Sequence, residues 1–271
     1  MSESWDIRCE RKGEVMDLGL RGKKAIVTGG TRGIGRAIVE KLADEGCDLA
    51  FCARNAEQVN EAVDTLKSKG VSVYGSVVDI AYGDVLKEWI REAGDKLKGL
   101  DILVSSAGAM AMGAEESSWM KNLQVDIFGA VNSVETALPM LEESAKESGD
   151  SAIVAIGSTA AVNAVEPSSY GAIKGALIHY IRGLAKQNAP KHVRANVVSP
   201  GMVYFEGGVW NRVEQRAPEY FKSSLARNPM GRMATPQDIA NAAVFLASPC
   251  SSFTSGINMI VDGAMTDRVN Y

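Results

Sequence analysis

The segment TGGTRGIG, residues 28–35, follows the short apolar run from Ala25 to Val27 and precedes residues with helical spacing. Glycine is entropically costly to order, so its concentration here needs a structural reason. One reason is a plain tight turn between a strand and a helix. The other is a backbone that must approach a phosphate closely at a helix N-terminus. Ligands of open α/β sheets bind where strands end and helices begin, which favours phosphate binding.

Around this segment, short apolar stretches alternate with helix-length stretches, which predicts parallel βα units and a sheet covered on both faces. We therefore predict an α/β fold of the Rossmann type, doubly wound, with a seven-stranded and mainly parallel sheet. Strands are expected at residues 24–27, 48–52, 71–78, 100–105, 152–156, 193–198 and 257–261.

Helices are predicted where apolar residues recur with a period near 3.6, as in residues 34–42 and 173–184. A further helix is expected to begin at Thr235-Pro236-Gln237-Asp238. This stretch combines a capping hydroxyl, a proline at the first helical position and an acid near the positive end of the helix dipole.

The chain is predicted to form a single dinucleotide-binding catalytic domain over residues 18–271. Residues 1–17 are rich in charge and lack periodicity, so we expect a flexible N-terminal extension. The regular alternation stops at about residues 202–234, a stretch too long for an ordinary connection, and we expect a substrate lid there.

Composition excludes several classes of partner. The 29 basic residues are scattered among 33 acidic ones, with a net charge of −4, so we expect no nucleic-acid partner. No apolar run has the length of a membrane span, and the N-terminus lacks the apolar core of a secretory signal. The four cysteines form no CxxC pair and there are two histidines, which argues against metal binding and disulfides. We expect a cytoplasmic protein.

The end of the second predicted strand bears on the choice of cofactor. A site for NAD usually has an acidic residue there, about 20 residues after the glycines, to hold the ribose hydroxyls. Here that place is occupied by Cys52 and Ala53, followed by Arg54, and Arg32 lies within the glycine segment. Two cations could flank the additional phosphate of NADP, so we predict NADP(H). The alternative is that both arginines are ordinary solvated side chains.

The stretch SSYGAIKG puts Tyr170 and Lys174 one helical turn apart, and Ser158 ends the fifth predicted strand. Hydride delivery to a carbonyl leaves an alkoxide that needs a proton from a nearby acid. A phenol has a pKa of about 10, and a neighbouring ammonium favours the phenolate. Tyr170 is therefore predicted as the general acid/base, with Ser158 orienting the carbonyl oxygen. The alternative is a solvated Tyr and Lys on an amphipathic helix.

These motifs, in this order, resemble the short-chain dehydrogenases/reductases in their compact single-domain branch, over about residues 18–265. The resemblance rests on TGGTRGIG, Asp79 in VVDI, SSAG at 105–108, Ser158, the YxxxK pair and SPG at 199–201. It implies that Asp79 and Ile80 contact adenine, that Lys174 also binds the nicotinamide ribose and that Val203 meets the carboxamide. It also implies a homodimer or homotetramer joined through the long helices after strands four and five.

Together, these arguments give one set of cofactor-binding candidates. They are Gly29, Thr31, Arg32, Gly33, Ile34, Gly35, Arg54, Asn55, Asp79, Ile80, Ser106, Ala107, Gly108, Tyr170, Lys174, Pro200, Gly201 and Val203.

Three positions depart from the family pattern. Asp126 stands where members usually have an asparagine that helps to hold a water linked to the catalytic lysine. An ionised Asp accepts hydrogen bonds but cannot donate them, and near Lys174 its charge would keep that lysine protonated. We count Asp126 among the catalytic candidates and expect a working enzyme with an altered relay. Ser105-Ser106 replaces two common asparagines, and Phe205 replaces a threonine whose hydroxyl commonly touches the cofactor amide.

The residues expected to shape the substrate pocket are mostly large and apolar. They are Met110, Met112, Val162, Met202, Tyr204, Phe205 and Trp210. This lining predicts an uncharged, fairly bulky ketone or secondary alcohol, aromatic or alicyclic. Alternatively, half of these side chains merely close the lid against the core.

Two other functions stay open. The first is reduction of 3-oxoacyl thioesters on an acidic carrier protein, which would need cations near the entrance, such as Arg212, Arg216, Lys222 and Arg227. The second is a nonenzymatic NADP-binding regulator. Intact Ser158, Tyr170 and Lys174 argue against the regulator, because a mere binder has no need of the phenol.

Overall fold

A computed structural model describes residues 17–163 and 167–267. The predicted N-terminal extension, residues 1–17, lies outside the described residues except for Asp17. The described chain forms a seven-stranded sheet in the order β3-β2-β1-β4-β5-β6-β7, and every pairing in it is parallel. The strands are β1 (Lys24–Thr28), β2 (Asp48–Ala53), β3 (Val73–Val77), β4 (Ile102–Ser105), β5 (Ser151–Ile156), β6 (Val193–Pro200) and β7 (Asn258–Val261).

The structure confirms the predicted α/β fold and all seven predicted strands, with small shifts at their ends. Strand β4 begins two residues later than expected, because Asp101 belongs to the turn before it, where its backbone N–H bonds the carbonyl of Lys24. Strand β6 runs two residues further, to Pro200. A proline at this position is compatible with the strand, because it stands at the strand end and its carbonyl group can still accept.

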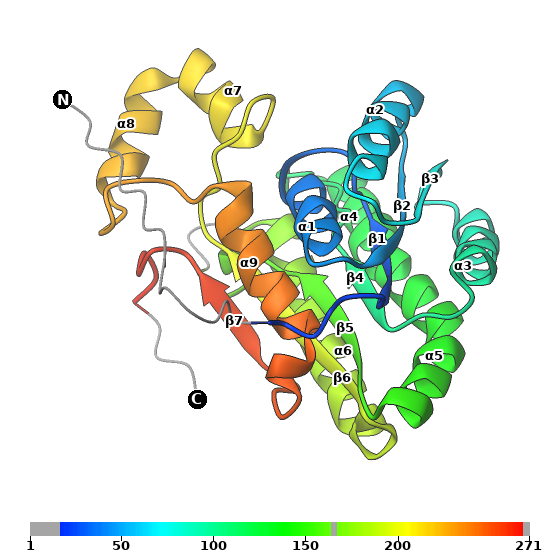
Figure 1. The fold of residues 1–271 in the computed structure, drawn as a ribbon. Helices are drawn as coiled ribbons and strands as arrows, with labels where there is room; N and C mark the ends of the chain where they lie inside the picture. Colours follow the sequence, from blue (N-terminus) through cyan, green and yellow to red (C-terminus); the bar gives the residue numbers. More distant parts are fainter. Residues whose placement is uncertain (1–16, 164–166, 268–271) are drawn as a thin grey trace, which may run out of the picture.

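Helices cover both faces of the sheet (Figure 1). The longer ones are α1 (Gly33–Asp44), α2 (Ala56–Lys67), α3 (Gly83–Leu97), α5 (Gly129–Ser148), α6 (Ser169–Asn188) and α9 (Pro236–Ala247). Alternate strand residues supply the two cores: Val27 packs with α1, α2 and α9, whereas its neighbour Ile26 packs with α3, α5 and α6. This is the period-2 alternation expected of strands buried on both faces.

The predicted helix starts are also confirmed. Helix α1 begins at Gly33, directly after the glycine segment. At α9, the Thr235 hydroxyl accepts from the N–H of Asp238, and the Asp238 carboxylate accepts from the N–H of Thr235. This reciprocal capping box fixes the residue at which the segment 202–234 ends and the helix α9, which packs on the sheet, begins.

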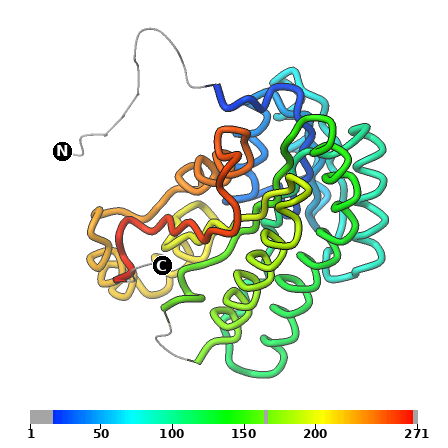
Figure 2. Tube along the Cα trace, turned by 90° about the horizontal axis from the view of Figure 1, so that it is seen from below, coloured from blue at the N-terminus to red at the C-terminus, as the bar shows by residue number. Residues whose placement is uncertain are grey.

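Residues 202–234 contain two short helices, α7 (Val209–Arg216) and α8 (Pro218–Ala226), which project beyond the sheet layers (Figure 1). The two ends of this segment meet, because Val203 forms a parallel bridge with Ala234. Figure 2 traces this segment in yellow to orange, and near its end Asn228 donates to the carbonyl of Asp262, just after β7.

Shorter helical turns complete the described chain. They are α4 (Glu116–Asn122), the π-helix η1 (Leu123–Phe128) and the 3-10 turns η2 (Thr159–Ala161), η3 (Ala189–Lys191) and η4 (Pro249–Ser251). Within residues 17–163 and 167–267, no helix has the length and apolar character needed to cross a membrane. The same residues contain no cluster of three or more His, Cys, Asp or Glu side chains placed to hold a metal ion.

Candidate active site

The glycine segment forms a tight loop at the carboxyl ends of β1 and β2. The backbone N–H groups of Gly29 and Gly30 both donate to the carbonyl of Cys52, at 2.8 and 3.1 Å. A β-carbon on Gly35 would overlap the carbonyl oxygen of Gly29, so no other residue fits there. Helix α1 has no side-chain cap at Arg32, which leaves its first N–H groups available to an anion. The loop therefore fits the phosphates of a dinucleotide.

Thr28 joins this loop to the segment after β4. Its side chain is buried, and its hydroxyl accepts from the N–H groups of Ser106 and Ala107 at 3.2 and 3.4 Å. This threonine was not among the predicted site residues, although it is the first residue of the glycine segment. It brings the predicted Ser106, Ala107 and Gly108 against the glycine loop.

The two arginines expected to select NADP lie on neighbouring loops and are exposed. Arg54 follows β2, and Asn55 caps helix α2 by accepting from the N–H of Gln58 at 2.8 Å. The hydroxyl of Thr31, next to Arg32, lies 3.3 Å from the side-chain oxygen of the same Gln58. The segments that carry Arg32 and Arg54 are therefore linked through Gln58.

The predicted adenine contacts lie after β3. Asp79 uses its carboxylate within its own turn, accepting from the N–H of Ala81 at 3.0 Å. Ile80 is buried, and its side chain fills the space where a β-carbon on Gly129 would lie. Ile80 therefore also packs against the start of α5.

The segments that carry Ser158 and Tyr170 meet where the chain leaves β5 and the first turn of α6 begins. Ser158 is half-buried, and its hydroxyl oxygen accepts from the N–H of Ala160 at 3.1 Å. Tyr170 is 7% exposed. The two segments touch, since a β-carbon on Gly171 would lie 2.7 Å from the carbonyl oxygen of Ala160. A serine hydroxyl and a buried phenol thus share the carboxyl edge of the sheet.

Lys174 lies one turn after Tyr170 and is enclosed, with 4% of its surface exposed. Its ammonium nitrogen is 5.8 Å from the centre of the Tyr170 ring and donates to the carbonyl of Ile156 at 2.7 Å. It also forms an ion pair with Asp126 at 2.9 Å. Burial acts to lower the pKa of Lys174, but the charges of Asp126 and Tyr170 outweigh burial and raise this pKa above its ordinary value. Lys174 is therefore a cation at neutral pH.

Asp126 reaches Lys174 from the π-helix η1, between α4 and α5. Its side chain is fully buried, and its second oxygen accepts from the N–H of Ala109 at 2.9 Å. π-helical turns are rare and are frequent at functional sites. The carboxylate thus ties the segment after β4 to the lysine of α6.

A second buried contact in this region was not predicted. The Asn122 side chain accepts from the N–H of Ala111 and donates to the Ala111 carbonyl and to the Ser169 hydroxyl. Ser169 in turn donates to the carbonyl of Gly113. This network holds residues 109–113 against the start of α6. Met110 and Met112 remain exposed there, and Met110 has a positive φ of 53°.

Phe205 lies at the cofactor end of the site. A β-carbon on Gly33 would come within 2.5 Å of the Phe205 ring, so the ring covers the first residue of α1. The preceding residues hold this arrangement: the N–H of Gly201 donates to Val261, and the N–H of Tyr204 donates to Ala234. Phe205, where the family resemblance leads us to expect a threonine hydroxyl, therefore presents an aromatic ring to the glycine loop.

Two predicted pocket aromatics pack within residues 202–234. The ring of Trp210 stacks on Tyr220 with centroids 6.2 Å apart, and Tyr204 meets Phe221 edge-on at 5.9 Å. The Tyr204 hydroxyl bonds Glu214, which raises the pKa of Tyr204 and keeps that phenol neutral. These aromatics hold α7 and α8 together.

The remaining two pocket candidates differ in exposure. Met202 is 5% exposed, so it contributes mainly to packing, whereas Val162 is half-buried just after η2. Only part of the predicted lining is thus available to a substrate.

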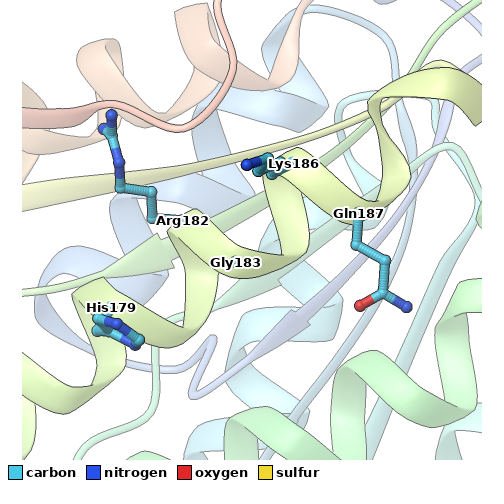
Figure 3. A pocket seen from close by; sticks show the side chains of 5 residues that line it. All are labelled: His179, Arg182, Gly183, Lys186 and Gln187. Atoms are coloured by element: carbon cyan, nitrogen blue, oxygen red, sulfur yellow. The ribbon is translucent and has the colours of Figure 1, made fainter.

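A shallow groove on the outer face of α6 is distinct from this site (Figure 3). It is lined by His179, Arg182, Gly183, Lys186 and Gln187. Tyr170 and Lys174 belong to the first turns of the helix, whereas the groove follows its later turns.

Comparison with known proteins agrees with this geometry. The family model described as enoyl-(acyl carrier protein) reductase matches residues 29–266. The fold and the sequence define an oxidoreductase that acts on alcohol or carbonyl groups with a nicotinamide cofactor. The chain belongs to the short-chain dehydrogenase/reductase family.

Particular relatives cover nearly the whole chain. Isoepoxydon dehydrogenase patN of Penicillium expansum is 33% identical over 256 residues, which is 93% of this chain and 97% of the relative. A tropinone reductase homolog of Arabidopsis thaliana is 35% identical over 91% of this chain and 93% of its own length. The structure is similar to L-sorbose reductase from Gluconobacter frateurii complexed with NADPH and L-sorbose, with a TM-score of 0.85 and 28% identity over 94% of this chain and all of that one.

Proposed function

We propose that the protein transfers a hydride between NADP(H) and an uncharged, fairly bulky ketone or secondary alcohol, with Tyr170 as general acid/base. The observation that carries this proposal is the group at the carboxyl edge of the sheet: a serine hydroxyl, a buried phenol and a buried ammonium on adjoining turns. Ligands of open α/β sheets bind at this edge.

The proposed steps belong to the chain's own residues. When bound, the nicotinamide supplies or accepts the hydride. Ser158 donates a hydrogen bond to the carbonyl oxygen and orients it, and Tyr170 gives that oxygen its proton as the hydride arrives. The Lys174 ammonium stabilises the phenolate that forms. In alcohol oxidation the same groups act in reverse, with the Tyr170 phenolate as base.

The choice of NADP(H) is supported by the two exposed arginines at the glycine loop, Arg32 and Arg54. Guanidinium groups bind phosphate through paired hydrogen bonds. The end of β2 carries Ala53 in place of an acid, so no carboxylate there would repel the additional phosphate. One relative with a similar structure was crystallised with NADPH.

An apolar substrate is supported by Met110 and Met112, whose side chains are exposed. Both lie within residues 109–113, the segment that Asp126 and Ser169 of α6 hold in place. Apolar linings favour ligands with little charge. Two relatives are named for isoepoxydon and tropinone, whereas the family model and another relative are named for acyl-carrier-protein substrates, so the choice between the alternatives rests on the lining and not on the names.

The cations expected at an acyl-carrier entrance support the thioester alternative less well. Lys222 pairs with Glu219, and Arg212 donates to the carbonyl of Gly207. The regulator alternative gains no support from the enclosed phenol and ammonium. We therefore retain the ketone or alcohol substrate.

The catalytic test is Tyr170→Phe, assayed against a panel of bulky ketones with NADPH and of alcohols with NADP. Removing the phenol hydroxyl is expected to lower kcat about 10³-fold, within the range for general acid/base groups, while NADPH still binds. Circular dichroism and NADPH fluorescence titration check folding and binding. Turnover equal to the native enzyme would contradict the mechanism.

The cofactor test is Arg54→Asp. We expect kcat/KM for NADPH to fall at least tenfold, because the variant loses a phosphate contact and gains a repelling charge, while NADH is less affected. Native enzyme that uses NADH as well as NADPH, or a variant with unchanged preference, would refute the choice of NADP.

We also propose that residues 18–271 act as a single domain, with residues 202–234 as its lid, and that the protein is a homodimer or homotetramer. The family resemblance implicates α5 and α6 in subunit contacts, and the groove of Figure 3 lies on α6. Sedimentation equilibrium tests the subunit number.

A further inference from the structure

A fully buried carboxylate faces the lysine of the proposed catalytic group. The charged and polar groups around the Lys174 ammonium come from three elements: Asp126 from η1, Tyr170 from α6 itself and the carbonyl of Ile156 from β5. Among the described residues, Asp126 is the acidic side chain paired with Lys174.

The two oxygens of Asp126 make different contacts, an ion pair for one and a hydrogen bond for the other. One lies 2.9 Å from the Lys174 nitrogen, and the other accepts from the N–H of Ala109 at 2.9 Å. Asp126 thus contacts the backbone after β4 and the ammonium on α6, while Lys174 contacts the end of β5. The ammonium is held between two elements and has little freedom to shift.

The negative charge of Asp126 has an electrostatic consequence for Tyr170. An isolated ammonium one turn away would favour the phenolate, because opposite charges attract. A carboxylate in contact with that ammonium compensates much of its field and favours retention of the proton on the phenol. Tyr170 and Lys174 interact closely, so their protons are lost from a coupled dyad rather than from independent groups.

We infer that Asp126 is a positioning residue, which holds Lys174 in place and biases the Tyr170–Lys174 dyad toward its fully protonated form, so that alcohol oxidation needs a higher pH, whereas at neutral pH the dyad is in the form that serves ketone reduction. In that direction the carbonyl carbon gains a hydride and the carbonyl oxygen takes the phenol proton. The resulting phenolate then regains a proton from solvent. This inference rests on the proposed function and concerns its pH dependence.

The test is Asp126→Asn, which keeps the shape of the side chain and removes its charge. Alcohol oxidation needs the deprotonated dyad, so its pH profile is measured from about pH 6 to about pH 10. We expect the apparent pKa of kcat/KM to fall by about one unit, as expected for loss of one charge at short range in a protein environment. Oxidation at neutral pH, expressed as a fraction of its plateau value at high pH, then rises up to about tenfold.

A second readout does not need the cofactor. Phenolate absorbance is titrated in the cofactor-free native protein and in Asp126→Asn, each compared with the same protein carrying Tyr170→Phe. The difference spectrum isolates Tyr170 from the other tyrosines. We expect the Tyr170 phenolate to form at lower pH when Asp126 is neutral.

The matched control is Asp101→Asn, the same chemical change at the opposite edge of the sheet. Asp101 is also buried, and it accepts from the Lys23 ammonium at 2.9 Å and from the N–H of Lys24 at 2.8 Å. It should lose stability but keep the native pH profile. An unchanged profile in Asp126→Asn, or an equal shift in Asp101→Asn, would overturn the inference. Full turnover by Tyr170→Phe would instead overturn the proposed function.

Discussion

Strand β5 has a buried ion pair at each end, and the two pairs are built differently. At the amino end, Arg194 of β6 binds Asp150 through two hydrogen bonds, at 2.7 and 3.0 Å. It also donates to the carbonyls of Leu246 and Ser248 and to the hydroxyl of Ser251. All five guanidinium donors are therefore used. This pair links the sheet to the turn after α9.

At the carboxyl end, Lys174 has fewer partners. Its ammonium carries three hydrogens. Within the described part of the chain, it donates a hydrogen bond to the Ile156 carbonyl and forms an ion pair with the Asp126 carboxylate. The remaining donor capacity is available to the site. A saturated ion pair holds the fold together, whereas an unsaturated one can act on a neighbouring phenol and a ligand.

The largest expected effect is at the unsaturated pair. Lys174→Met should lower kcat/KM by about 10³- to 10⁴-fold, because the phenolate loses its stabilising charge and Asp126 is left buried without a counter-ion. The double variant Lys174→Met/Asp126→Asn removes both charges and should recover stability, as measured by urea unfolding, but not activity. Recovery of activity in the double variant would show that Lys174 serves the fold alone.

The saturated pair should show the opposite pattern. Arg194→Met is expected to lower the free energy of unfolding by about 3 kcal/mol, since it leaves the Asp150 carboxylate without its ion-pair partner and removes all five hydrogen bonds of the guanidinium. The kcat/KM of the folded protein at low temperature should change little. Urea unfolding and steady-state kinetics on the same preparation test this contrast. A large loss of activity without a loss of stability would contradict it.

The smallest expected effect on the free energy of unfolding is at an exposed ion pair. Arg232 bonds Asp238 at the start of α9, which lowers the pKa of that carboxyl below its usual range. Arg232→Ala should reduce the free energy of unfolding by less than about 1 kcal/mol at neutral pH. A carboxyl group whose pKa is lower in the folded protein contributes stability at pH values above its unfolded pKa. This stability is lost as the pH falls through the folded pKa. The difference between variant and native protein should therefore shrink as the pH falls below the ordinary range of an aspartate, as thermal unfolding at several pH values will show.

The sequence was sufficient to predict features that depend on local order. Alternation and the glycine segment predicted the strands, and the start of α9 follows from four consecutive residues. Ser158, Tyr170 and Lys174 were predicted together because a strand, a turn and the next helix bring them to one edge of the sheet. Asp126 lies 48 positions before Lys174 and entered through the family resemblance rather than through a local pattern.

Other contacts had no local signal. Asn122 bonds Ser169 across 47 positions, and Arg194 bonds Asp150 across 44. An asparagine within a helix or an arginine within a strand does not reveal which distant group it binds, because such pairing depends on tertiary packing. The approach of Phe205 to Gly33 is of the same kind.

The π-helix η1 makes the chain sensitive to its length as well as to its composition. A π-helical turn contains more residues than an α-helical one, and each residue of an α-helix turns the next side chain by about 100°. Removing one residue between Leu123 and Phe128 would regularise the turn and rotate Asp126 away from its partner. An insertion or deletion at this point of the chain would therefore change which side chain faces Lys174 without altering the sheet.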